Sequence, residues 1–162
     1  MHPLQILQLM ILLTLANGTP VVANKIFGRR FAWPLDAGIK FFDGRPLLGA
    51  SKTIRGLALS LLVTAACTPL IGLDAKIGAV VAATAMAGDL LSSFVKRRLD
   101  LPPSSRATGL DQIPESLLPL LACREALSLS AADIAAGVAI FFLGEVFLSR
   151  LFYRLRLRDR PY

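Results

Sequence analysis

The sequence predicts an all-α polytopic membrane protein with about five transmembrane helices and two polar cytoplasmic loops. Three observations support this fold class. Hydrophobic residues make up 54% of the 162 residues and the mean hydropathy is +0.60, which is more apolar than is usual for a soluble domain. The apolar residues gather in runs long enough to cross a bilayer. Nearly all cations lie in the polar segments outside these runs.

We expect a single integral-membrane domain over residues 1–162, with the apolar runs as its helices. The first run contains the polar sequence Asn-Gly-Thr-Pro at 17–20, so we expect a bent or interrupted helix there. A signal peptide is the alternative for this run, but no basic segment precedes it. The predicted spans cover residues 3–24, 56–73, 77–95, 113–127 and 132–148; cytoplasmic loops cover 25–55 and 96–112, and a basic tail covers 149–162.

The cations predict how the chain is oriented. Sixteen of the eighteen Lys and Arg residues lie in the two loops and the tail (seven, four and five), which leaves only Lys76 and Arg124 on the other face. The positive-inside rule makes the cation-rich face cytoplasmic. With five spans, the N-terminus is outside and the C-terminus inside. We therefore expect an integral protein of the cytoplasmic membrane whose active site faces the cytoplasm.

Composition argues against several functions. The net charge is +7, but no basic stretch is interleaved with aromatic residues, so we expect no nucleic-acid partner. His2 is the only histidine and precedes the first span, which argues against a histidine nucleophile or metal site. Cys67 and Cys123 lack metal-ligand spacing and are interpreted as apolar filling residues.

Asp89 lies inside the third apolar run, where an ionised carboxylate is costly unless it meets water or a cation. On a helix, Asp89 and Lys96 share one face, about 10 Å apart along the axis. Ser92 and Ser93 lie between them. The pattern predicts a polar stripe that enters the cytoplasmic headgroup layer.

A second acid, Asp111, follows the basic run Lys96-Arg97-Arg98 in the second loop. A basic belt that only anchors the span would explain the cations alone. Two carboxylates beside them favour Mg²⁺ and a polyphosphate, because the metal takes hard oxygen ligands and the cations neutralise phosphate charge.

The first loop contains "FFDGRPLLGASKTIRG" at residues 41–56. Glycines, hydroxyl groups and Lys52 suit phosphate oxygens, although the spacing is not that of a P-loop. If the second helix begins near Thr53, that residue caps it beside Lys52 and Arg55, which makes an anion site. The alternative is a solvated basic loop on anionic lipid.

These motifs resemble a known family. "FFDGRPLLGASKTIRG", "GDLLSSFVKRRLDLPPSS" and "GLDQIP" occur in the order found in the CDP-archaeol synthase family. The segment from "SFVKRR" to "LDQ" is also similar to the signature of the wider phosphatidate cytidylyltransferase superfamily. The resemblance runs from "ANGTPV" at 16–21 to the fourth span. It implies that CTP and a lipid phosphate react to give a CDP-activated lipid and pyrophosphate, with Mg²⁺ required.

The resemblance also implies roles for individual residues. Asp89 and Asp111 match acidic metal-binding positions, and with Lys96 they form the predicted catalytic set. Many relatives carry an acid just before Ser-Lys-Thr, where this chain has Ala50, so any acidic chemistry of the first loop falls to Asp43. The predicted substrate-binding residues, to which we add Ser93 from the polar stripe, are Asn17, Asp43, Gly44, Ser51, Lys52, Thr53, Arg55, Gly56, Ser93, Arg97 and Arg98.

Two alternatives stay open. One is a small membrane anion or lipid transport protein with Asp89 in a conduction path, although the sequence has no inverted repeat. The other is a CDP-alcohol phosphotransferase-like enzyme, of whose signature "DGRPLLG" is only a fragment. The expected partners are CTP, a lipid phosphate and membrane lipids, with isoprenoid-ether and fatty-acyl tails both compatible. Small residues on the helix faces would allow a homodimer.

Overall fold

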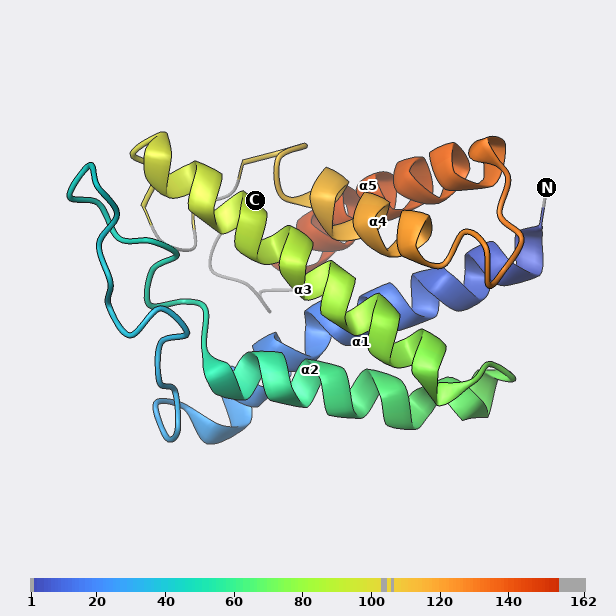
Figure 1. The fold of residues 1–162 in the computed structure, drawn as a ribbon, viewed down its shortest axis with the longest axis horizontal. Helices are drawn as coiled ribbons and strands as arrows, with labels where there is room; N and C mark the ends of the chain where they lie inside the picture. The colour runs from blue at the N-terminus through green and yellow to red at the C-terminus, as the bar shows by residue number, and fades with distance from the viewer. Residues whose placement is uncertain (1, 103–104, 106, 155–162) are drawn as a thin grey trace.

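The computed structural model describes residues 2–102, 105 and 107–154, with side chains as far as residue 147. The described chain consists of α-helices, one short 3-10 helix and connecting loops, with two isolated β-bridges in place of strands. This confirms the all-α prediction. In chain order the elements are α1 (Pro3–Phe27), α2 (Ile54–Cys67), η1 (Thr68–Ile71), α3 (Ala75–Arg98), α4 (Gln112–Ala122) and α5 (Ala131–Arg154) (Figure 1).

Three of these helical segments are long and apolar enough to cross a membrane: Pro3–Phe27, Ile54–Ile71 and Ala75–Arg98. α4 differs from the predicted fourth span, 113–127, because it has only 11 residues. It is therefore about 16 Å long, roughly half the thickness of a hydrocarbon core. The chain then turns through residues 123–130 before α5 begins. The count of five spans stays a prediction.

α3 lies at the centre of the bundle, where it contacts α1, α2 and α4 (Figure 1). Its small buried residues allow these neighbours to approach closely. α5 completes the bundle by packing on α4 and α1. The buried core is apolar and draws on four of the helices, with Leu9, Leu12, Leu13 and Ala16 from α1, Val81, Ala82 and Ala85 from α3, Leu120 from α4, and Ile134 and Phe141 from α5.

Of the two predicted outcomes for the first span, a bend or an interruption, the interruption does not occur, because α1 continues through Pro20 to Phe27. A proline inside a helix leaves the carbonyl four residues earlier without its backbone donor. In α1 that carbonyl belongs to Ala16, and the Ser60 hydroxyl of α2 donates to it at 2.8 Å. Gly56 of α2 also packs directly against the Pro20 ring. The second helix thus supplies the bond and the space that keep α1 intact.

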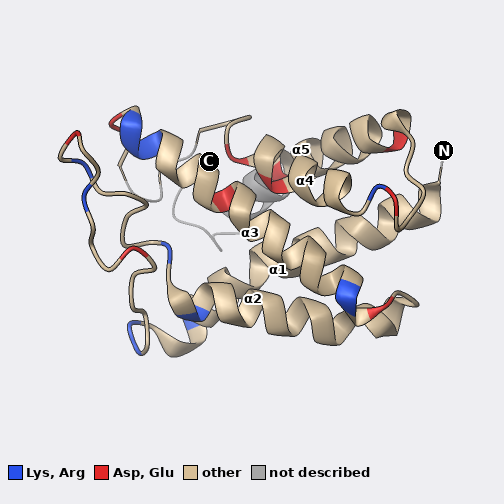
Figure 2. Ribbon diagram, viewed as in Figure 1, with Lys and Arg blue, Asp and Glu red and all other residues tan. Residues whose placement is uncertain are grey.

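Charged residues gather at one end of the bundle, where α3 ends, α2 begins and the connection between α1 and α2 lies (Figure 2). We call this the loop end, and residues 28–53 the first loop. At the opposite end the backbone amide of His2 donates to Asp133 at 2.8 Å, and its imidazole lies 3.0 Å from the same carboxylate. Asp133 also accepts from the Ser130 hydroxyl. These bonds fasten the start of α1 to the start of α5.

Candidate active site

Gly88 allows α3 and α4 to meet at the candidate site. A β-carbon at Gly88 would lie 2.4 Å from the Pro114 carbonyl oxygen and 2.7 Å from the Glu115 amide nitrogen. No side chain fits in that space, since real β-carbons do not approach backbone atoms so closely. The first turn of α4 therefore rests directly on α3. Asp89, the next residue of α3, is brought beside Glu115.

Asp89 binds a lysine from the first loop. The Lys52 ammonium group donates to both Asp89 carboxylate oxygens, at 2.6 and 2.5 Å. The Glu115 carboxyl group hydrogen-bonds with that of Asp89 and interacts electrostatically with Lys52 and with Glu145 of α5. Glu115 is only 7% exposed. Lys52 thus supplies the cation that the costly position of Asp89 in an apolar helix requires.

A second charged pair lies two turns further along α3. Lys96 is buried, its ammonium group is 2.7 Å from Asp111, and it donates to the Ser105 carbonyl at 3.0 Å. Between the two pairs, the buried Ser92 hydroxyl donates to the Leu110 carbonyl at 2.7 Å. The predicted polar stripe of α3 therefore exists, but it faces α4 and the segment before it.

Asp111 and Glu115 are four residues apart around the first turn of α4, so they lie on one face of that helix. α3 presents Lys96 opposite Asp111 and Asp89 opposite Glu115. The two predicted metal-binding acids, Asp89 and Asp111, are consequently paired with different lysines.

The start of α2 confirms one local prediction. Thr53 caps the helix, and its side chain accepts from the Gly56 amide at 3.1 Å. Lys52, just before the cap, reaches Asp89, whereas Ser51 is exposed. Arg55 points elsewhere, because its guanidinium group donates to the carbonyls of Gly28 and Arg30 at the end of α1.

Arg98 binds the hairpin at the tip of the first loop. Its guanidinium group donates to the Asp43 carboxylate at 2.7 Å and to the Pro46 carbonyl at 2.5 Å. It also lies over the rings of Phe41 and Phe94, at 4.7 and 5.0 Å from their centroids, an arrangement typical of cation–π contacts. The end of α3 thus holds the hairpin in place.

The other predicted residues occupy varied positions. Gly44 has φ +77°, as the turn after Asp43 requires. Arg97 is buried and donates to the Pro102 carbonyl at 2.9 Å, and Ser93 is buried within α3. Asn17 lies within α1, and no described residue satisfies its amide nitrogen. Its role in substrate binding stays a prediction.

Sequence reasoning missed Glu115 as a site residue. Glu115 is an acid within the predicted fourth span, 113–127. Its partnership with Asp89 depends on the close approach at Gly88, which no periodicity reveals. The sequence did contain one usable signal, which is that Asp89 and Glu115 are acids in adjacent apolar runs. Acids within membrane segments usually face the interior of the bundle and interact with one another.

The carboxyl groups at the site show whether Mg²⁺ could bind there. Among the described residues, no three His, Cys, Asp or Glu side chains are grouped as metal ligands. Asp89 and Glu115 still provide two carboxyl groups in direct contact. Mg²⁺ is commonly held by one or two protein carboxylates, with water and substrate phosphates as the other ligands. The pair fits that mode of binding and not an all-protein cage.

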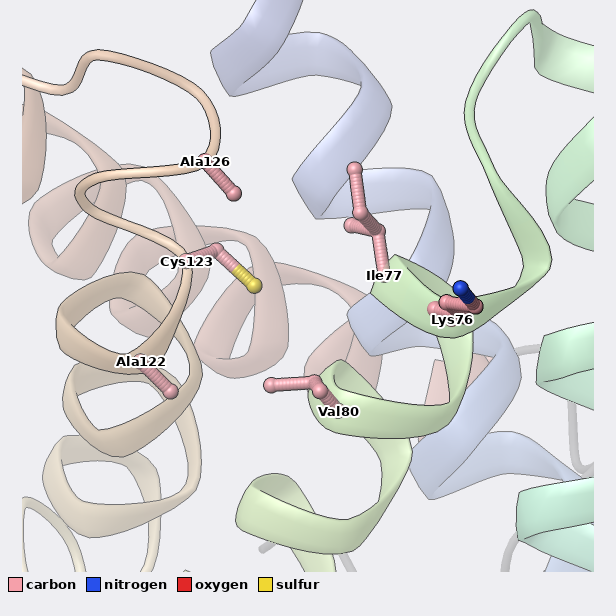
Figure 3. Close-up of a pocket in the computed structure, with 6 residues that line it drawn as sticks. All are labelled: Lys76, Ile77, Val80, Ala122, Cys123 and Ala126. Atoms are coloured by element: carbon pink, nitrogen blue, oxygen red, sulfur yellow. The ribbon is translucent and has the colours of Figure 1, made fainter.

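A pocket of about 190 Å³ lies away from the charged cluster, between α3 and the turn after α4 (Figure 3). Its lining is mostly apolar, and Cys123 and Val80 point toward each other across it. The lining residues are Lys76, Ile77, Val80, Ala122, Cys123 and Ala126. Lys76 belongs to the first turn of α3, so this pocket lies at the opposite end of that helix from Lys96.

Comparisons with known proteins identify the relatives of this chain. A family model described as CarS-like, CDP-archaeol synthase, matches residues 68–162. The CDP-archaeol synthase of Pyrobaculum calidifontis is 33% identical, covering 98% of this chain and 99% of the relative. That of Hyperthermus butylicus is 41% identical over 110 residues, covering 60% of this chain and 59% of the relative.

A solved structure of an intramembrane enzyme for archaeal membrane lipid biosynthesis superposes with a TM-score of 0.75 and is 33% identical. The match covers 87% of this chain and 90% of that one, so the likeness extends over most of the chain. Together with the family model, which covers more than half of the chain, this establishes the relationship. The chain belongs to the CDP-archaeol synthase family.

Proposed function

We propose that the chain is a CTP-dependent cytidylyltransferase that converts a membrane lipid phosphate into a CDP-activated lipid and pyrophosphate. The observation that carries the proposal is the cluster of Lys52, Asp89 and Glu115, formed where the first loop and α4 meet the membrane-length helix α3. Such a cluster suits phosphate chemistry at a bilayer, because it offers carboxylates for a metal and cations for phosphate charge. The names of the relatives favour a lipid of archaetidate type.

In the proposed reaction, an oxygen of the lipid phosphate attacks the α-phosphorus of CTP in line. A new P–O bond forms while the bond from the α-phosphorus to the bridging oxygen breaks, and pyrophosphate leaves with that electron pair. A lipid phosphate is already anionic near neutral pH, so a strong general base is not needed. This agrees with the position of the single histidine, His2, beside Asp133 at the opposite end of the bundle.

Each charged group has a proposed task. Lys52 contacts the lipid phosphate, and Lys96, Arg97 and Arg98 surround the triphosphate. These cations would stabilise the charge that develops on the phosphoryl oxygens and on the departing pyrophosphate. Their present partners are protein oxygens, which substrate phosphates would replace.

We also propose that Asp89 holds Mg²⁺ and that Glu115 lies beside it, whereas Asp111 pairs with Lys96 one helical turn from Glu115. When bound, the ion would supply Lewis-acid stabilisation of the triphosphate and of the leaving pyrophosphate. The loop end is proposed to face the cytoplasm, from which CTP arrives, and the positive-inside rule supports that orientation.

The direct test is pyrophosphate release by the detergent-purified protein. We expect release from CTP only when a lipid phosphate is present. Parallel assays with geranylgeranylated glycerol phosphate and with phosphatidate identify the lipid class. Release of pyrophosphate from CTP in the absence of a lipid phosphate would refute the proposed reaction. The absence of release with both lipids would refute it as well.

A further inference from the structure

Asp36 is a buried carboxylate of the first loop to which neither the sequence motifs nor the proposed reaction gives a role. Its side chain is 5% exposed. It accepts from three backbone amides: Gly38 at 3.1 Å, Leu48 at 2.9 Å and Gly49 at 2.9 Å. No ion pair involves Asp36 in the described part of the chain. Hydrogen bonds from backbone amides therefore stabilise the buried charge of Asp36, as in other carboxylates that organise a loop.

These three bonds join two parts of the first loop that are far apart in sequence. One part is the turn at 36–38, and the other is the pair Leu48-Gly49, whose glycine has φ +96°. Between them runs the hairpin that carries Asp43 at its tip, with a bridge from Lys40 to Pro46 at its base. Asp36 thus closes the base of the hairpin.

The backbone of Lys52 is held by the direct neighbours of this junction. Its amide donates to the Gly49 carbonyl at 3.2 Å, and its carbonyl accepts from the Leu35 amide at 2.7 Å. Gly49 is one of the residues that donate to Asp36, and Leu35 precedes Asp36 in the chain. Both backbone bonds of Lys52 therefore depend on segments that the Asp36 carboxylate joins.

We infer that Asp36 is a positioning residue for the reaction, which sets the backbone of Lys52 so that its ammonium group is held beside Asp89, where a substrate phosphate would meet it. The inference rests on the proposed function, in which Lys52 contacts substrate phosphate. Asp36 itself touches neither Lys52 nor Asp89 through any described side-chain bond, so its effect passes through the loop backbone. The loop lies outside the apolar core, which consists of helix residues and residues from the turn between α4 and α5. Loss of the Asp36 bonds should consequently leave the bundle folded.

A double-mutant cycle tests this inference, using Asp36→Asn, Lys52→Gln and the double variant. An amide at position 36 keeps the shape, but it is neutral and places an N–H group against backbone donors. We expect Asp36→Asn to lower kcat/KM at least tenfold and Lys52→Gln to lower it further. The double variant should be no worse than Lys52→Gln alone, because both changes remove the same ammonium contact.

Asp74→Asn is the matched control. Asp74 also accepts a backbone amide, that of Lys76 at 2.7 Å, but it caps α3 at the opposite end of that helix from Lys96. We expect kcat/KM to stay within twofold of wild type. Multiplicative losses from Asp36→Asn and Lys52→Gln would overturn the inference, as would a bundle that fails to fold when Asp36 is replaced. In either result Asp36 acts through something other than Lys52.

Backbone hydrogen exchange supplies a readout that needs no activity. We expect Asp36→Asn to speed exchange at least tenfold in peptides covering 46–53, while peptides from α1 and α3 exchange as in wild type. Unchanged exchange at 46–53 would overturn the inference. A wild-type protein that lacks lipid-dependent pyrophosphate release would instead refute the proposed function, and the exchange result would still report on Asp36.

Discussion

The Lys52 ammonium group binds both carboxylate oxygens of Asp89, although 37 positions separate the two residues in the chain. Both side chains are about one-fifth exposed, at 21% and 22%. The pair is therefore shielded yet open to exchange with a phosphate or a cation. A lysine and a metal ion would compete for the charge of the same two oxygens, so binding of metal and substrate should loosen the pair.

Replacement of Lys52 tests this view of the pair. Lys52→Gln removes a cation proposed to stabilise phosphate charge in the transition state, and loss of one such group typically costs about 100-fold or more. We expect kcat/KM to fall by about that factor in the pyrophosphate-release assay. Lys76→Gln, in the first turn of α3, is the control and should stay near wild type. Equal activity of the two variants would remove Lys52 from the reaction.

Glu115 gives a second prediction, because it contacts Asp89 inside the bundle. We expect Glu115→Gln to weaken binding of Mn²⁺, used as a spectroscopic substitute for Mg²⁺, and to lower turnover by about tenfold or more, as for loss of a group that holds a metal ligand in place. Electron paramagnetic resonance of the Mn²⁺ titration gives the affinity. Glu125→Gln, on the exposed turn after α4, is the control. Unaltered Mn²⁺ affinity in Glu115→Gln would exclude Glu115 from the metal site.

The close contact at Gly88 predicts a steric effect. Gly88→Ala would force α3 and α4 apart, and overpacking of this kind costs about 1–3 kcal/mol. We expect a lower unfolding temperature and loss of activity, since Asp89 and Glu115 would separate. Gly18→Ala in α1 meets no atom within 4 Å and should not destabilise the protein. Thermal unfolding in detergent distinguishes the two variants. Equal unfolding temperatures would show that α3 and α4 can move apart at position 88 without loss of stability.

Acid pH gives a fourth prediction, through Asp36. Burial alone would raise its pKa, but the bonds from Gly49, Leu48 and Gly38 outweigh this, so its pKa lies below the ordinary 3.8. A depressed pKa stabilises the folded loop above pH 3.8, and the contribution is lost as pH falls through the folded-state value. We expect exchange protection of 46–53, corrected for intrinsic rates, to hold from pH 6 to about pH 4 and to decline below that. In Asp36→Asn this decline should be absent.

The sequence predicted those features that depend on local pattern. Apolar runs located the helices, and the threonine before α2 was recognised as its cap. The acid at position 89 was correctly expected to need a partner. That partner, Lys52, could not be selected over the nearer cations of α3, because the choice depends on how the first loop folds back. Periodicity carries no information on such a long-range contact.

The missed features share a physical cause. The sequence around Pro20 left an interrupted helix open, but a hydroxyl from another helix satisfies the carbonyl that Pro20 leaves free, and α1 is continuous. No sequence motif includes Asp36, and its three amide donors come from turns that only the folded loop brings together. In each case a group on a distant segment supplies the hydrogen-bond partner that a polar group lacks locally. Reasoning from one sequence identifies the polar group that needs a partner but not the residue that provides it.

The shortness of α4 has a consequence for the surrounding lipid. A helix of 11 residues covers about half of a typical hydrocarbon core, so hydrophobic mismatch arises beside it. A bilayer relieves such mismatch by local thinning, at a cost that grows with its thickness. The Asp89 and Glu115 carboxyls, where α3 meets the first turn of this short helix, would then lie closer to the headgroup layer than in an undeformed membrane. In reconstituted vesicles, the rate should therefore decline as the host lipids lengthen, which makes bilayer thickness a regulator of the enzyme.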